Sequence, residues 1–342
     1  MSRTATGAKA PTMRDVAEAA GVSTALVSIV FRGVAGASEE TRARVFAEAE
    51  RIGYRANRTA SLMKLRRTKH LGVTFSAGSA FHAALVENIQ EAATEAGYEV
   101  VLSLVSRSHD EERAVDALLG FRCEGVVLLG CQLPTAKLAA LATEVPLVLV
   151  GRSGDVEGVA AVRSADKRGV ALAVDHLAKL GHRDIVHVDG GPQPVSAQRR
   201  RGFRTAMRRR GLGEFVRVTT GGDRERDGRR AAEELLRGGA PPTAVVAFND
   251  HCALGVQDAF SRAGLRVPED CSVTGYDNST FAALNAIDLT TVDQEPAALA
   301  RAAVRVAVDR LEGRSADADD LVLEPRLVVR GSTAPPRTED RG

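Results

Sequence analysis

Polar side chains lie where several predicted buried strands of this 342-residue sequence end. They are Ser76, Arg152, the pair Asn249-Asp250 and the pair Asp277-Asn278, and Arg199 starts the helix after a further strand. Open α/β sheets bind ligands at the carboxyl ends of their strands, so these residues would share one cleft. Carboxylates, an amide and a guanidinium suit bidentate hydrogen bonds to the hydroxyl groups of sugars or other small polyols. Each residue alone could be an ordinary loop residue, but the shared topological position favours a binding site.

A second group of residues has the spacing of a DNA-reading helix. Three short helical patterns fit within residues 12–53, and the connection at 21–23 is short enough to require a tight helix-turn-helix. The second helix of this motif presents its N-terminal part to base edges in the major groove. The residues in that position are Thr24, Ala25, Ser28 and Ile29, with Arg32 near the helix end. Hydroxyls can bond to bases or phosphates, whereas alanine and isoleucine offer only apolar contact, for instance to a thymine methyl.

The charge distribution favours DNA over protein as the partner of this three-helix unit. Residues 1–70 contain 13 Lys and Arg and 6 Asp and Glu, a charge of +7, while the rest of the chain carries −5. A basic head on an acidic body is typical of a head that contacts a polyanion. The alternative is a structural unit that docks on another protein.

A basic linker follows the three helices. Leu62 and Met63 stand among cations, the pattern of an apolar wedge that unstacks a base step from the minor groove. Arg58 and Lys64 are candidate phosphate ligands, together with Arg66 and Arg67. An isolated segment this short is a marginal helix in water, so we expect it to fold only on contact. The alternative is an ordinary solvated linker.

Signatures of catalysis and export are missing from the sequence. It has no P-loop, no dinucleotide-binding glycine pattern, no nucleophile elbow and no zinc-protease motif. His176 and His182 flank a helix end and His251 follows a strand, which are weak signals. The four cysteines form no C-x-x-C pair and are expected to be small buried residues. Because the catalytic motifs are missing, we expect no enzyme activity, metal or cofactor. Because a signal core and an apolar span are missing, we expect a cytoplasmic protein.

The local patterns predict an all-α head followed by an α/β core. Thr12, Ser23 and Ser38 are placed to cap the three helices of the head, and Asp15 completes a capping box with the first of them. From residue 71 apolar strands alternate with helices, which predicts parallel sheets covered on both faces. The predicted strands are 71–75, 99–105, 125–130, 146–151, 185–190, 244–249 and 272–277, with two short strands within 321–330. About 270 residues exceed one doubly wound sheet, so we expect two such subdomains with a cleft between them.

The ordered motifs together resemble the lac-repressor (LacI/GalR) family of bacterial transcription regulators. The resemblance covers residues 12–333. The head resembles the family's DNA-binding segment in TMRDVAEAAGVSTALVSIVFRG (12–33) and TRARVFAEAERIGYRANRTASLMK (41–64). The core resembles its effector domain in DHLAKLGHRDIVHVDG (175–190), VVAFNDHCALGV (245–256) and AGLRVPEDCSVTGYDN (263–278).

The resemblance implies a periplasmic-binding-protein-like core whose chain crosses between subdomains near 164, 292 and 325. The implied domains are a disordered arm (1–11), a helix-turn-helix domain (12–55), a hinge (56–70), a core (71–333) and a disordered tail (334–342). Within the core, the N-subdomain takes about 71–164 and 293–324, and the C-subdomain takes about 165–292 and 325–333. The implied DNA-binding positions are Thr24, Ala25, Ser28, Ile29, Arg32, Asn57, Arg58, Ala60, Met63 and Lys64. The implied effector positions are Ser79, Phe81, Arg152, Arg199, Asn249 and Asp277.

The sequence departs from the family pattern at both sites. In the recognition helix Ile29 and Arg32 replace the usual Arg and Asn, so the operator would differ from the common one. Near the cleft the usual Asn-Pro-Phe-Phe is SAFH (79–82), and the usual Asp-Asn before Gly169 is AD (165–166). The chain has no tryptophan to stack on a sugar. The candidate substitutes are Phe81, Phe248, Tyr276 and Phe281.

The resemblance implies a homodimeric repressor of a pseudo-palindromic operator, controlled by a small molecule, expected to be a sugar or sugar derivative, in the cleft. Two alternatives remain: a sugar-sensing binding protein, which shares the core fold, and an enzyme with an accessory DNA-binding head. The basic head argues against a pure receptor, and the missing catalytic constellation argues against the enzyme.

Overall fold

The computed structural model describes residues 11–31, 35–54, 67–154, 156–314 and 320–337. The chain divides into two compact units, residues 1–68 and residues 69–342. Among the described residues no helix is long and apolar enough to cross a membrane.

The N-terminal unit is a three-helix domain, formed by α1 (Met13–Ala20), α2 (Thr24–Phe31) and α3 (Glu39–Arg51). Thr12 and Asp15 form the predicted capping box on α1, and Ser23 and Ser38 cap α2 and α3 through their hydroxyls. Gly21 ends α1 in the left-handed conformation, at φ 65°, which lets the chain turn sharply into α2. The small core consists of Val16, Ala17, Ala20, Val27, Val30, Val45 and Ala49.

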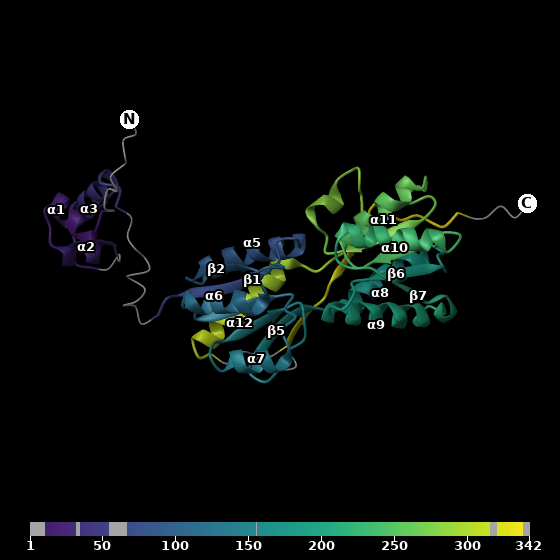
Figure 1. The fold of residues 1–342 in the computed structure, drawn as a ribbon, viewed down its shortest axis with the longest axis horizontal. Helices are drawn as coiled ribbons and strands as arrows, with labels where there is room; N and C mark the ends of the chain where they lie inside the picture. Colours follow the sequence, from purple (N-terminus) through teal and green to yellow (C-terminus); the bar gives the residue numbers. More distant parts are fainter. Residues whose placement is uncertain (1–10, 32–34, 55–66, 155, 315–319, 338–342) are drawn as a thin grey trace, which may run out of the picture. The chain divides into compact units, whose positions relative to one another are not determined.

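The second unit contains two sheets of six strands each, and all strand pairs but one are parallel (Figure 1). The first has the order β11-β5-β4-β3-β1-β2. Its strands are β1 (His70–Phe75), β2 (Glu99–Leu104), β3 (Gly125–Leu129), β4 (Leu147–Val150), β5 (Val159–Ser164) and β11 (Asp320–Leu323). Its helices are α5 (Ala80–Glu95), α6 (Glu111–Gly120), α7 (Thr135–Ala142) and α12 (Pro296–Leu311).

The second sheet repeats this plan with the order β12-β10-β9-β8-β6-β7, in which only β12 runs antiparallel to its neighbour. Its strands are β6 (Ile185–Asp189), β7 (Arg217–Thr220), β8 (Ala244–Ala247), β9 (Ser272–Tyr276), β10 (Thr290–Asp293) and β12 (Arg326–Val328). Its helices are α8 (Asp166–Lys179), α9 (Pro194–Arg209), α10 (Glu225–Arg237) and α11 (Asp250–Arg262), with 3-10 turns at Gly213–Phe215 and Thr280–Ala283.

Each sheet is buried on both faces, as continuous apolar strands predict. In β3 and β4 alternate residues enter two different cores: Val127 and Val148 pack under α5 and α12, whereas Val126 and Leu147 pack under α6 and α7. In the second sheet α8 and α9 cover one face while α10 and α11 cover the other (Figure 1). Helices on both faces leave only the strand ends open for a ligand.

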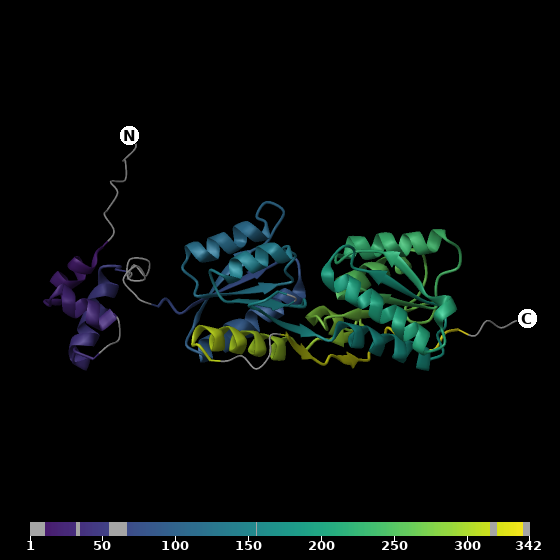
Figure 2. The same ribbon diagram turned by 90° about the horizontal axis from the view of Figure 1, so that it is seen from below.

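The chain passes between the two sheets three times. It leaves the first sheet after β5, returns after β10 to form α12 and β11, and leaves again to form β12 (Figure 2). Residues 166–293 are therefore inserted between two parts of the first subdomain. Because β11 pairs with β5 and β12 pairs with β10, the strands that flank these connections are neighbours in both sheets.

The sequence-based prediction of the core needs two corrections. It omitted α7 and the short strands β5, β7 and β10, which are real elements. It also placed residues 334–337 in a disordered tail, but they pack on the second subdomain. The Ala334 carbonyl accepts a hydrogen bond at 2.8 Å from His182, and the Arg337 guanidinium lies 2.6 Å from the Asp270 carboxylate.

Candidate functional site

A cavity of about 400 Å³ lies between the two subdomains, at the carboxyl ends of both sheets. Its wall on the first subdomain includes Ser76, Ser79, Phe81, His82, Glu111, Gly130 and Gln132. Its wall on the second subdomain includes Asp166, Gln193, Arg199, Asp223, Arg224, Phe248, Asn249, Asp277 and Gln294. Every element that contributes begins or ends at the cleft, so a ligand here would touch both halves of the core.

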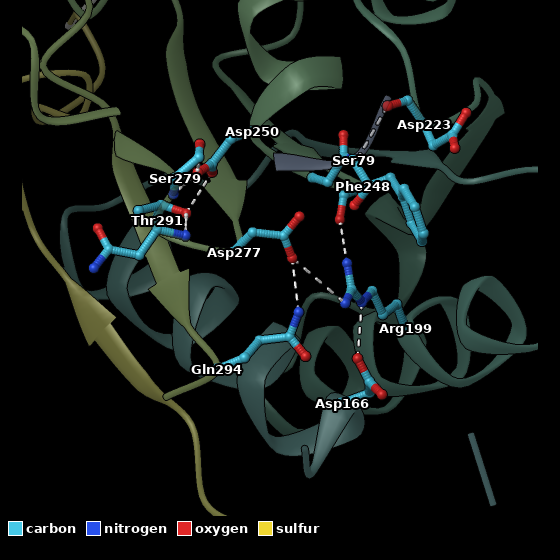
Figure 3. Close-up of polar contacts among 12 residues, drawn as sticks. Ser79, Asp166, Arg199, Asp223, Phe248, Asp250, Asp277, Ser279, Thr291 and Gln294 are labelled. Atoms are coloured by element: carbon cyan, nitrogen blue, oxygen red, sulfur yellow. Dashed lines mark hydrogen bonds and ion pairs between the residues drawn. The ribbon is translucent and has the colours of Figure 1, made fainter. Parts of the chain in front are cut away.

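Arg199 is the centre of the polar wall (Figure 3). Its Nε donates to Asp166 Oδ1 at 2.8 Å and its Nη1 donates to the Phe248 carbonyl at 2.6 Å. The guanidinium stacks on Tyr276, 3.6 Å from the ring centroid. Burial alone would lower the pKa of Arg199, but the charges of Asp166, Tyr276 and Asp277 raise it, so the residue stays cationic. A buried arginine fixed on three sides is a preorganised donor at the cavity.

Asp277 faces Arg199 across the wall, with its Oδ1 4.0 Å from Nη2 (Figure 3). Gln294 donates to the same oxygen at 2.7 Å. Burial raises the pKa of Asp277 to about 7, while Arg199 pulls it down. The carboxyl group can therefore accept or donate a hydrogen bond near neutral pH, which suits a hydroxyl ligand that does both.

Asn249 couples the cavity to the start of α11. Its Oδ1 caps that helix by accepting from the Cys252 amide at 2.8 Å, and its Nδ2 donates to the Asp223 carbonyl at 3.1 Å. The neighbouring Asp250 is turned inward, where Ser279 and Thr291 donate to it. Asn249 is thus a cleft residue, whereas Asp250 holds loops together.

The structure brings together five of the six predicted effector residues: Ser79, Phe81, Arg199, Asn249 and Asp277 all line the cavity. Arg152 is not among the lining residues, because its guanidinium caps the Cys131 and Leu133 carbonyls at 3.3 and 2.9 Å. A strand-end position does not fix the direction of a long side chain when free carbonyls lie nearby.

Of the four aromatic candidates, Phe81 and Phe248 line the cavity. Tyr276 is buried beneath Arg199, and Phe281 packs edge-on against His251 with ring centroids 5.0 Å apart. Stacking on a ligand would therefore fall to the two phenylalanines.

The sequence placed His82 and Asp166 near the cleft as departures from the family pattern, but not among the effector positions. Several cavity residues are thus missing from the predicted effector positions: His82, Glu111, Asp166, Asp223, Arg224 and Gln294. Three of them come directly after strands that the prediction omitted. Asp166 follows β5, Asp223 follows β7 and Gln294 follows β10. The rule that ligands bind at carboxyl ends of strands would have found them if those strands had been recognised.

In the head, Thr24 and Ala25 are exposed at the start of α2, and Ser28 and Ile29 are partly buried. Ile29 lies toward Gly36, with Cγ2 3.4 Å from the position of a side-chain carbon there. The other predicted DNA contacts lie outside the described residues: Arg32, Asn57, Arg58, Ala60, Met63 and Lys64. The exposed N-terminal turn of α2 is the described part of the surface that could meet DNA.

The remaining titratable residues singled out from the sequence have structural partners. His176 bonds to Thr333, and His251 bonds to Glu225. All four cysteines are buried and unpaired, as expected. Among the described residues no group of three or more His, Cys, Asp or Glu side chains could hold a metal ion.

Comparison with known proteins identifies both units. Residues 12–57 match the family of bacterial regulatory proteins of the lacI type, and residues 174–333 match a periplasmic binding protein-like domain. The ribose operon repressor of Escherichia coli is 32% identical over 94% of this chain and 99% of its own length.

Two solved structures are similar. A LacI transcriptional regulator from a Rhodococcus species is 47% identical, with a TM-score of 0.76 over 78% of this chain and all of its own. A lac repressor dimer bound to operator and an anti-inducer is 29% identical, with a TM-score of 0.82 over 95% of this chain and all of its own. The fold, the two matched domains and this identity over nearly the full length show that the chain belongs to the lacI family of bacterial regulatory proteins.

Proposed function

We propose that this chain is a homodimeric transcriptional repressor whose affinity for its operator is set by a neutral polyhydroxylated molecule, a sugar or sugar derivative, bound in the cleft. The observation that carries the proposal is the cavity itself, which joins the two halves of the core and is lined by preorganised donors and acceptors from both.

The charges around the cavity support a neutral ligand. Three arginines line the cavity: Arg199 donates to Asp166, Arg224 lies 3.6 Å from the Asp223 carboxylate, and Arg107 is exposed at the first subdomain. Both arginines on the second-subdomain wall are therefore paired with carboxylates, whereas a phosphate group there would need a cation of its own. Hydroxyl groups both donate and accept, so a polyol can use the guanidinium and the carboxylates together. The two phenylalanines on opposite walls can cover the apolar faces of a sugar ring.

DNA recognition would use α2 in the major groove of each half-site. Two heads on a dimer would read a pseudo-palindrome, and the basic segment around Met63 would contact the minor groove between the half-sites. Residues 67–69 lead directly from that segment into β1 of the first subdomain, so a ligand that changed the angle between the subdomains would act on the segment through β1. A coupling of roughly 1–3 kcal/mol would change operator affinity about 5- to 150-fold.

The test is a salt-titrated binding assay on the purified protein and the DNA upstream of its gene, with and without D-ribose, D-glucose and cellobiose. Steep salt dependence, about −0.9 in log–log slope per neutralised phosphate, together with a shift by one sugar, supports the proposal. Specific binding that no sugar changes contradicts the sugar assignment and keeps the DNA role. Binding at the non-specific level to this DNA and to a pool selected from random sequences contradicts the repressor.

A further inference from the structure

His82 occupies the wall of the cleft that the first subdomain provides. It lies in the first turn of α5, where its backbone amide donates to the Ser79 hydroxyl at 3.2 Å. The helix cap therefore fixes the backbone of His82, and the side chain reaches back toward the end of β1. There the Ser76 amide lies 3.1 Å from His82 Nδ1.

This contact determines where the imidazole carries its proton. A backbone amide can only donate, so Nδ1 must present a lone pair to Ser76. Burial lowers the pKa of His82 to about 4; the charge of Asp223 opposes this effect and that of Arg224 adds to it. The ring is therefore neutral at pH 7, and a neutral ring that accepts at Nδ1 has its proton on Nε2.

The edge of the His82 imidazole that carries Nε2 lies next to Gly130, and both residues line the cavity. A side-chain carbon on Gly130 would stand 2.9 Å from both Cε1 and Nε2, so the glycine leaves the space that the ring occupies. Within the described part of the chain, no protein group accepts a hydrogen bond from Nε2, although the side chain lines the cavity. A polar N–H beside a binding cavity and without a protein partner needs an acceptor from water or from a ligand.

We propose that the Nε2–H group of His82 donates a hydrogen bond to an acceptor oxygen of the effector and makes His82 a specificity-determining residue of the cleft. The inference rests on the proposed function. It adds a hydrogen bond to the ligand from the first subdomain, opposite the contacts from Arg199 and Asp277. Asp223 and Glu111 line the same cavity and can accept from a hydroxyl there. The preferred effector therefore carries a hydroxyl or ring oxygen at this end, and an analogue that lacks this oxygen is rejected.

The first test needs no ligand. Long-range proton–nitrogen correlation spectra of the full chain report the tautomer of each histidine, and the His82→Gln variant assigns the His82 signals by their disappearance. We expect a neutral ring protonated at Nε2 from pH 5 to pH 8. A ring protonated at Nδ1, or charged at pH 7, overturns the proposal.

The second test measures binding of D-ribose, D-glucose and cellobiose by calorimetry to the wild type, His82→Gln and His82→Phe. Phenylalanine keeps an aromatic ring but has no donor, while glutamine keeps an N–H donor. We expect at least a tenfold loss of affinity in His82→Phe and a smaller loss in His82→Gln. Equal affinities of the wild type and His82→Phe, with both folded by circular dichroism, overturn the proposal.

The two tests separate this inference from the proposed function. If none of the three sugars binds to the wild type, the sugar assignment fails for these probes. The tautomer then decides whether the donor exists, and an Nδ1-protonated ring removes it. If a sugar binds and shifts operator affinity but ignores His82→Phe, the repressor proposal stands and the role of His82 is wrong.

Discussion

Arg224 donates a hydrogen bond from its guanidinium to the backbone carbonyl of Gly78, 2.5 Å away, and so joins the two subdomains at the edge of the cleft. A side-chain carbon at residue 78 would lie 1.6 Å from the Arg224 Nη1 atom, so any larger residue there would displace the tip of the arginine from this position. Arg224 follows β7, and Gly78 lies in the turn between β1 and α5. This hydrogen bond links two loops that both line the ligand cavity.

Replacing Gly78 with alanine should break this hydrogen bond. The added methyl group displaces the arginine side chain, so the segments 76–79 and 221–225 should exchange their amide hydrogens faster in deuterated water. Gly120→Ala is the matched control, because a side-chain carbon there meets nothing within 4 Å. Unchanged exchange of both segments in Gly78→Ala would show that the bond does not restrain the cleft.

Arg199→Met should be strongly destabilising. The substitution leaves Asp166 buried without the cation that donates to it, and breaking a buried pair in this way costs about 3–5 kcal/mol. The exposed pair of Arg217 and Asp184 supplies the control, since Arg217→Met should cost less than about 1 kcal/mol. Urea unfolding of both variants measures the difference. Similar losses in the two would mean that the cleft arginine is solvated.

The stability of the fold should depend on pH through His187 in β6. This residue is fully buried, its Nδ1 lies 2.8 Å from the Val246 carbonyl, and burial lowers its pKa to about 4. Between pH 6.5 and pH 4 the unfolded chain binds a proton that the folded chain does not. The free energy of unfolding therefore falls as pH falls, by about 1.4 kcal/mol per pH unit from this residue.

The comparison of His187→Leu with the wild type isolates this effect. The raised pKa of Asp277 acts in the opposite direction over the same range, since the folded state binds its proton first. Asp277 is unchanged in the variant, so its contribution cancels in the difference. The variant should lose less stability than the wild type between pH 6.5 and pH 4.5 in urea unfolding. Parallel curves would mean that His187 binds its proton as readily in the folded protein as in the unfolded chain.

The double substitution Thr24→Ala and Ser28→Ala should weaken binding to the operator. If both hydroxyls contact DNA as proposed, their loss should cost roughly 1 kcal/mol each, about fivefold per hydroxyl, with little change in binding to non-specific DNA. Thr205→Ala is the control, because Thr205 is exposed on α9 in the other unit. Fluorescence anisotropy at one salt concentration measures the ratio of specific to non-specific affinity. An unchanged ratio would place sequence reading elsewhere in the head.

The helices of the head and the longer strands could be predicted from the sequence because their signals are local. Thr12 and Ser38 are capping residues whose contacts lie within the first turn of each helix, and the run at 125–129 is apolar throughout. The strand β10 gives no such signal. Its first residues, Thr290 and Thr291, are polar but fully buried, and they are satisfied by Arg330, Ser332 and Asp250 from distant parts of the chain.

The same difference separates the predicted cavity residues from the rest. Arg199 and Asp277 stand beside long recognisable strands, so their position follows from the strand-end rule. The orientation of Arg152 depends on the carbonyls of Cys131 and Leu133, twenty residues away in the chain, and no local pattern contains that information. Tertiary contacts decide where a long polar side chain points.

The interleaved path of the chain has a consequence for recombination between relatives. Because β11 pairs with β5 and β12 pairs with β10, neither half of the core is one continuous stretch of gene. A chimera with a single junction between 166 and 293 would combine strands from two parents within a sheet. To exchange the second half as a whole, residues 166–293 must be replaced together, and the chain from β12 onward must be replaced as a separate segment. The second half of the core, with its wall of the cavity, is therefore encoded in two separate stretches, and a viable hybrid must take both from the same parent.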